Sequence, residues 1–148
     1  MPLEYRVVPR RAVLISATGT VIPSECEALV ALLLEEPAIE EVLPVLVDVR
    51  GAGADVSTRD LVHFATLARL LVKRGMDLIA ITVDPGPMLT LARAFEVAAR
   101  AVGVHAAVFD SYEQARVWLR LRDDLDVSPG SIAPPGSPSE APIAIRSQ

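Results

Sequence analysis

The chain has 148 residues, of which 51% are hydrophobic and 22% charged, and its formal net charge is −5. This length and composition are typical of one packed domain rather than of a disordered chain. The acidic balance argues against the broad basic surface that general nucleic-acid binding needs, so no nucleic-acid partner is expected.

The sequence shows no targeting or anchoring segment. Residues 1–6 lack the basic start and apolar run of a signal peptide. No stretch of about 18 apolar residues is present that could span a bilayer. The single cysteine, Cys26, excludes an intramolecular disulfide. These features predict a cytoplasmic protein without membrane insertion.

The composition changes sharply near Asp126. The segment that follows holds five prolines, at positions 129, 134, 135, 138 and 142, together with several serines and few large apolar residues. Proline removes a backbone donor, and a segment of this kind has little apolar surface to bury. We therefore predict an α/β domain at residues 1–124 and a disordered Pro/Ser-rich tail at residues 125–148.

Five segments have the pattern of strands. Residues 5–8 and 12–16 are close enough in sequence to pair antiparallel. Residues 45–49 are a short β-branched run, and residues 105–109 form the last strand. Residues 78–83 are apolar almost throughout, which is typical of a central strand that is covered on both faces.

Four segments have the pattern of helices. The first begins at Pro23, ends before Pro37, and has a predicted buried face of Cys26, Leu29, Val30, Leu33 and Leu34, with Glu25, Glu35 and Glu36 off that face. The second has Ser57 and Asp60 in a capping-box pattern and stops at Gly75. The third has an apolar stripe of Met88, Leu91, Ala92, Phe95, Ala99 and Val102. The fourth follows Ser111 and points Ala115, Trp118 and Leu119 inward.

Strands and helices alternate after the first strand pair. Because crossovers between parallel strands are right-handed, this order predicts a layered α/β domain. The expected fold class is a mixed, mostly parallel five-stranded sheet with four helices.

Two stretches resemble the STAS domain, the fold of bacterial anti-sigma factor antagonists, and in particular the small stand-alone STAS-like proteins of bacteria. Residues 45–51 (VLVDVRG) are similar to the family's shared strand-to-loop segment. Residues 91–96, 106–110 and 115–119 are similar to its third helix, final strand and final helix. The resemblance covers about residues 5–121. It implies a non-enzymatic regulatory module that docks a protein partner near the start of the second helix.

The resemblance makes Ser57 a candidate phosphoacceptor. Antagonists carry Asp-Ser-(Ser/Thr)-Gly at the start of this helix, and the matching residues here are Val56, Ser57, Thr58 and Arg59. A phosphate would add negative charge to a docking surface. The other interpretation, which we favour because Val56 and Arg59 depart from the motif, is a plain N-cap.

The polar face of the second helix is the candidate docking surface, with Ser57, Thr58, Arg59 and His63 at its start. Arg59, His63, Arg69 and Lys73 make this face basic in an acidic chain. An ordinary solvated helix face has the same pattern, and we favour that interpretation.

No motif for catalysis, a metal or a cofactor stands out. Asp48 ends a strand as a receiver phosphoacceptor does, but the acidic pair and the lysine of that site are missing. Gly51 and Gly53 form an incomplete dinucleotide motif. His63 and His105 have no nucleophile or carboxylate at a suitable spacing, and Cys26 falls on a buried helix face.

Small-ligand or lipid binding is the alternative function. A buried pocket would favour it, although about 120 ordered residues leave little spare volume for one. The identity of a protein partner and the formation of a homodimer stay open.

Overall fold

The structure is a computed structural model that describes residues 3–121. Its strands are β1 (Leu3–Val8), β2 (Ala12–Ala17), β3 (Thr20–Val21), β4 (Val45–Asp48), β5 (Gly53–Ala54), β6 (Leu78–Thr82) and β7 (His105–Phe109). Its helices are α1 (Pro23–Glu35), α2 (Thr58–Lys73), α3 (Pro87–Ala101) and α4 (Tyr112–Leu119). The end of the predicted domain, at 122–124, and the predicted tail at 125–148 lie outside the described residues.

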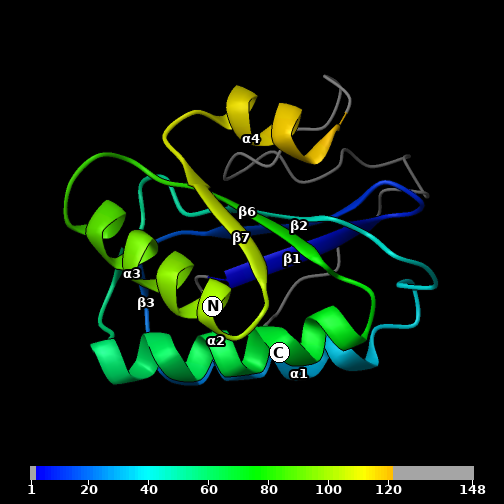
Figure 1. Cartoon of the computed structure of the whole chain (residues 1–148), viewed down its shortest axis with the longest axis horizontal. Helices are drawn as coiled ribbons and strands as arrows, with labels where there is room; N and C mark the ends of the chain where they lie inside the picture. The colour runs from blue at the N-terminus through cyan, green and yellow to red at the C-terminus, as the bar shows by residue number, and fades with distance from the viewer. Residues whose placement is uncertain (1–2, 122–148) are drawn as a thin grey trace.

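The main sheet has five strands in the order β1-β2-β4-β6-β7 (Figure 1). The β1 strand pairs antiparallel with β2, and every other neighbouring pair is parallel. The predicted α/β fold class, with a mixed and mostly parallel sheet and four helices, is confirmed. The apolar strand β6 lies inside the sheet between β4 and β7, as its composition predicted.

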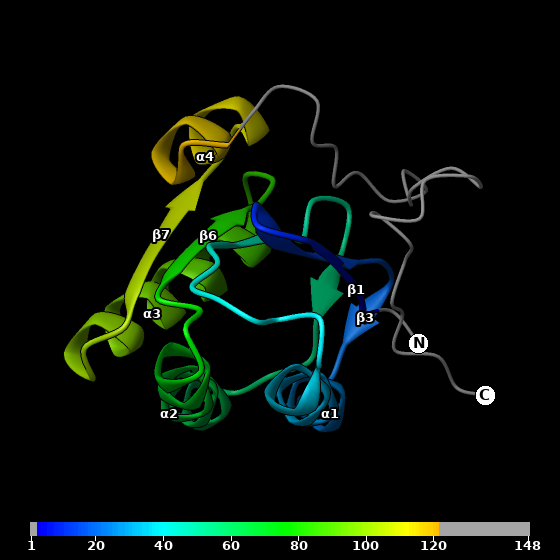
Figure 2. The same cartoon turned by 90° about the vertical axis from the view of Figure 1, so that its right-hand side faces the viewer.

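The helices form two layers of unequal size. Figure 2 shows α1, α2 and α3 on one face of the sheet and α4 on the other. The larger apolar core lies between the sheet and the three helices, and includes the fully buried side chains of Leu33, Ile39, Leu43 and Met76. A smaller core lies under α4. Of the helices in the described residues, none has the length and apolar character that crossing a membrane requires.

The helix ends follow the predicted signals. Pro23 is the first residue of α1, and the capping box of Ser57 and Asp60 opens α2. Gly75 has a φ of +109°, which an L side chain rarely adopts, and it follows the end of α2. The Arg74 guanidinium donates to the carbonyl oxygens of Leu34 at 3.2 Å and Glu36 at 2.9 Å. These two bonds fix the carboxyl ends of α1 and α2 together.

A second, two-stranded sheet was not predicted. Its strands β3 and β5 are parallel and have only two residues each, too short to leave a periodic pattern in the sequence. The Gly53 N–H donates to the Gly19 carbonyl at 2.8 Å, and the Asp55 N–H donates to the Val21 carbonyl at 2.9 Å. This small sheet ties the loop after β4 to the loop after β2.

Three side chains lie elsewhere than the helix patterns predicted. Glu25 is buried rather than off the core face, because its carboxylate turns back and accepts a hydrogen bond from the Ile22 N–H at 3.1 Å. Glu36 is half-buried and accepts a 2.8 Å hydrogen bond from the Tyr5 hydroxyl. Trp118 is 37% exposed, and its ring rests 5.7 Å from that of Phe109 between ring centroids.

The stripe on α3 is only partly buried. Ala92 and Ala99 are buried, as predicted, whereas the larger side chains of Met88, Leu91, Phe95 and Val102 are half-buried. The large side chains of Met88, Phe95 and Val102 therefore pack against the core without being fully covered.

Side chains of α3 close the outer edge of β7. The Val108 N–H donates to the Glu96 carboxylate at 2.9 Å, and the Arg100 guanidinium donates to the Ala106 carbonyl at 3.2 Å. Unpaired groups on an edge strand invite another strand to pair. This edge is thus blocked within the monomer.

Neighbouring leucines on α1 test the assigned core face. Leu33 is fully buried and Leu32 is 41% exposed. We expect Leu33→Ala to lower the free energy of unfolding by about 2–5 kcal/mol, because it removes buried surface and leaves a void. Leu32→Ala should change it by less than about 1 kcal/mol. Urea denaturation measures both, and equal losses would mean that the face of α1 is misassigned.

Candidate functional site

Ser57 caps α2 in the way the sequence predicted. Its hydroxyl oxygen accepts a hydrogen bond from the Asp60 N–H at 3.1 Å. The Asp60 carboxylate accepts one from the Ser57 N–H at 2.8 Å. Ser57 is exposed and Asp60 is half-buried, so the cap forms at the protein surface. The capping role is confirmed, and phosphorylation of Ser57 stays a prediction.

The other predicted docking residues lie at the same end of α2. Thr58, Arg59 and His63 are exposed, and the His63 imidazole lies 3.3 Å from the Glu27 carboxylate of α1. Val62, which sequence reasoning did not single out, is 53% exposed on the same two turns. The residues therefore form one continuous surface at the start of α2.

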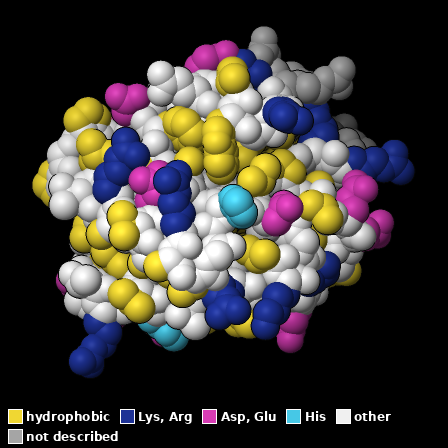
Figure 3. All heavy atoms as spheres, in the orientation of Figure 1, with side chains coloured by type: hydrophobic (Ala, Val, Ile, Leu, Met, Phe, Trp, Pro, Cys, Tyr) yellow, Lys and Arg dark blue, Asp and Glu magenta, His cyan; other side chains and the backbone are white. Residues whose placement is uncertain are grey.

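The face of the molecule drawn in Figure 3 carries mixed charge. Figure 3 shows one face of the molecule, on which basic, acidic and apolar side chains are interspersed. This face has no broad basic field of the kind that follows a nucleic-acid backbone.

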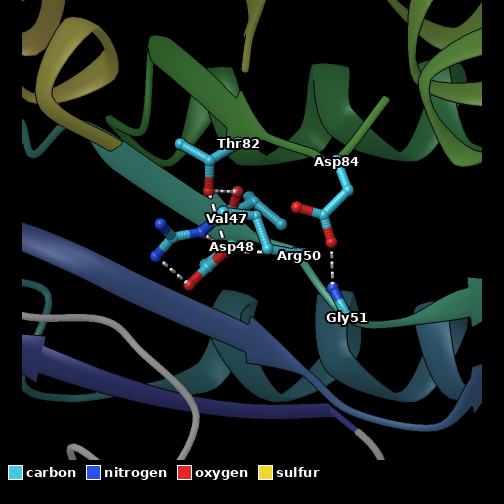
Figure 4. Close-up of polar contacts among 6 residues, drawn as sticks. All are labelled: Val47, Asp48, Arg50, Gly51, Thr82 and Asp84. Carbon is cyan, nitrogen blue, oxygen red and sulfur yellow. Dashed lines mark hydrogen bonds and ion pairs between the residues drawn. The ribbon is translucent and has the colours of Figure 1, made fainter. Parts of the chain in front are cut away.

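A buried polar network lies at the carboxyl ends of β4 and β6 (Figure 4). Asp48 is fully buried and accepts hydrogen bonds from the Arg50 guanidinium at 2.8 and 2.9 Å. It also accepts from the Arg50 N–H at 3.1 Å and from the Thr82 hydroxyl at 2.9 Å. The carboxylate is inaccessible and saturated with donors, which suits a structural role.

The network fixes the loop that leads to α2. Beside it, the Asp84 carboxylate accepts a 2.8 Å hydrogen bond from the N–H of Gly51, whose φ is +78°. Gly51 therefore serves as a turn residue, as the sequence indicated. The same loop continues through β5 to Val56 and Ser57, so the network sets where α2 begins.

An apolar cavity of about 200 Å³ lies between the sheet and helices α1, α2 and α3. The sheet contributes its floor, which includes Val45, Val47, Ile79 and Ile81. The helices contribute its walls, which include Cys26, Leu29, Phe64, Leu71, Leu91 and Phe95. Val21 of β3, Ala54 of β5 and Val56 line it at the carboxyl edge of the sheet. No charged residue is among the lining side chains of the described chain.

The cavity explains why apolar side chains inside the domain are incompletely covered. Val47 lies on β4, an interior strand of the sheet, and yet is only half-buried. Its neighbours on the same face, Val45 and Val49, are 1% and 9% exposed. Phe95 and Leu91 of α3 and Phe64 of α2 border the cavity and are half-buried as well. The helices therefore do not close tightly over the middle of the sheet.

Cys26 contributes the only titratable side chain among the described lining residues. Burial raises the pKa of its thiol to about 12, with further contributions from the charges of Glu25, Glu27 and Asp60. The thiol is thus protonated at neutral pH and is a poor nucleophile. Cys26 serves the cavity as a small apolar side chain.

The remaining candidates do not come together. His105 is exposed at the start of β7, away in sequence from His63 on α2. No group of three or more His, Cys, Asp or Glu side chains suited to a metal ion is present in residues 3–121.

Comparison with known proteins gives a distant likeness in structure and none in sequence. No protein-family model matches the sequence, and no curated protein is similar to it. The fold is similar to the crystal structure of an uncharacterised protein from the DUF3478 family with a SpoIIAA-like fold, from Shewanella loihica PV-4. The two are 18% identical over 79% of this chain and 91% of that chain, with a TM-score of 0.49.

The described elements have the mixed α/β arrangement that the sequence predicted: an antiparallel β1, four parallel strands and helices on both faces. A likeness as distant as that to the Shewanella protein concerns the fold alone. It says nothing of activity, partner or ligand.

Substitutions at Ser57 test the cap. We expect Ser57→Ala to cost about 1 kcal/mol of unfolding free energy, because an orphan N–H of the first turn loses its acceptor. Ser57→Asp should leave stability nearly unchanged, since aspartate also caps and suits the helix dipole. Thr58→Ala, at the exposed next position, is the control and should change stability by less than about 0.5 kcal/mol. Chemical denaturation measures all three, and an unaffected Ser57→Ala protein would contradict the cap.

Proposed function

We propose that this protein is a non-enzymatic binding module of STAS-like fold that holds a small apolar molecule between its sheet and helices α1–α3. The observation that supports the proposal is the partly open apolar cavity of about 200 Å³. Packed domains hold few voids larger than a water molecule, because empty space forfeits dispersion contacts. A cavity of this size is therefore unusual in a small domain, and this supports a role in binding.

The chemistry of the lining supports an apolar occupant rather than water. A buried water needs two to four polar partners, and apolar cavities of about 150 Å³ stay dry and accept benzene or xenon. The lining here combines aliphatic and aromatic side chains from three helices and four strands of the main sheet. A molecule in this space would gain contacts with side chains that are now half-buried, such as Val47 and Phe95.

A matched pair of alanines on α3 tests the cavity. Ala92 lines the cavity, whereas Ala94, on the same helix, is exposed. We expect Ala92→Leu to raise the free energy of unfolding by about 1–2 kcal/mol, because the added carbons fill empty apolar space. Ala94→Leu should change it by less than about 0.5 kcal/mol.

The same variants test binding, with benzene as the probe. Benzene should shift the methyl NMR signals of Val47 and Met88 saturably in the full-length protein and in Ala94→Leu, but not in Ala92→Leu. If Ala92→Leu folds poorly, Val47→Ile takes its place as the filling variant. It adds one methyl group to the floor of the cavity and should weaken benzene binding. Binding that survives both filling variants, or no binding at all, would contradict the proposal.

The start of α2 supports a second candidate function, docking of a protein partner. The supporting observation is Val62, an apolar side chain that is 53% exposed and is flanked by the exposed Arg59 and His63. An apolar residue rimmed by charged groups is a common arrangement in protein interfaces. The occupant would be a protein whose docking face is apolar and acidic.

Charge and polarity changes on α2 test the docking surface. We expect Val62→Asp and Arg59→Glu to lose a cellular partner in parallel pull-downs with the tagged full chain. Lys73→Glu, at the exposed far end of the same helix, should retain that partner. All three should unfold like the unchanged protein. The docking candidate would be wrong if the three variants and the unchanged protein captured the same proteins.

A further inference from the structure

The cavity offers no partner for a charged or strongly polar group. The polar groups of its floor belong to the backbone of β4 and β6, which is paired in parallel ladders with both neighbouring strands. Its side chains are hydrocarbon apart from the thiol of Cys26 and the thioether of Met88. Burying an ion without a partner is very costly, and burying an unpaired polar group is also unfavourable.

The charges that act on the thiol of Cys26, in the cavity lining, are acidic. Glu25, Glu27 and Asp60 lie close enough to Cys26 for their charges to raise the pKa of its thiol. Glu25 is itself buried at the start of α1. No lysine, arginine or histidine is among the cavity's lining residues in the described part of the chain. An anion beside Cys26 would meet repulsion from these carboxylates, and no cation among the described lining residues would compensate for it.

The volume limits the size of the occupant. A cavity of about 150 Å³ holds a single benzene ring. The cavity of about 200 Å³ therefore suits a substituted ring or a short branched hydrocarbon rather than a full lipid chain with its headgroup.

Resting on the proposed function, we infer that the cavity selects neutral apolar molecules of about one substituted ring and excludes carboxylates of the same shape. The selection follows from the uncharged lining, from the paired backbone of the floor and from the acidic groups near Cys26. The ligand class is thus an uncharged hydrophobic compound, and free fatty or aromatic acids are rejected.

Nitrobenzene and benzoate provide the test, since they have nearly the same shape and differ in net charge. Toluene serves as the wholly apolar reference. Each is titrated into the full-length protein at neutral pH, with the methyl NMR signals of Val47 and Met88 as the readout. Toluene and nitrobenzene should bind saturably, and benzoate should bind more than tenfold more weakly than nitrobenzene. All binding should be lost in Ala92→Leu and kept in Ala94→Leu.

The outcomes separate the inference from the function on which it rests. Benzoate that binds as tightly as nitrobenzene, and whose binding Ala92→Leu abolishes, overturns the charge selection while the cavity remains a binding site. Failure of all three compounds to bind the unchanged protein, or binding that Ala92→Leu leaves intact, overturns the proposed function itself. When nitrobenzene binds in the cavity, the ratio of the nitrobenzene and benzoate dissociation constants decides whether the charge selection holds.

Discussion

The buried carboxylate of Asp48 is the constraint on which the carboxyl end of this sheet depends. An ion in the interior is tolerated only if it is paired and hydrogen-bonded, and Asp48 meets this requirement through Arg50 and Thr82. The pairing draws Arg50, two residues after β4, and Thr82, the last residue of β6, to the same point. The loop from Val49 to Ser57 begins at this point. The carboxylate therefore helps to fix the position of the start of α2 and of one end of the cavity.

The cavity affects the folding stability of a domain of this size. Apolar side chains that line the empty space forfeit part of their dispersion contacts, which lowers the stability of the native state. The total stability of a small domain is only about 5–15 kcal/mol. A ligand that fills the space restores part of these contacts, and it stabilises the native state by mass action. Ligand binding and folding stability are therefore coupled in this protein.

The elements of the fold could be predicted because each depends on a local pattern. The antiparallel first pair, the interior strand β6 and the capping box at Ser57 all follow from alternation, apolar runs or turn chemistry within about ten residues. The miniature sheet of β3 and β5 could not be predicted, because two-residue strands leave no such pattern.

The cavity could not be predicted because its existence depends on how several helices and strands pack together. The sequence shows that Leu91 and Phe95 share a helix face, and an apolar face is normally packed. Whether the face meets the sheet depends on the volumes opposite it and on the spacing of α2 and α3, which no short window contains. The alanines that face the sheet, among them Ala68 and Ala92, are the signal that was present. Their small size is ambiguous, however, because it also permits close helix packing.

The two proposed sites share a structural boundary. Val56 lines the cavity, and the next residue, Ser57, caps α2 at the edge of the docking surface. A ligand affects a partner at that surface only if it binds more tightly to one arrangement of this loop than to another. The loop is held at one end by the Asp48 network and by the bond from Gly53 to Gly19, and at the other by the capping box. With both ends fixed, contact between a ligand and Val56 is the direct route by which filling the cavity could change the surface at Ser57.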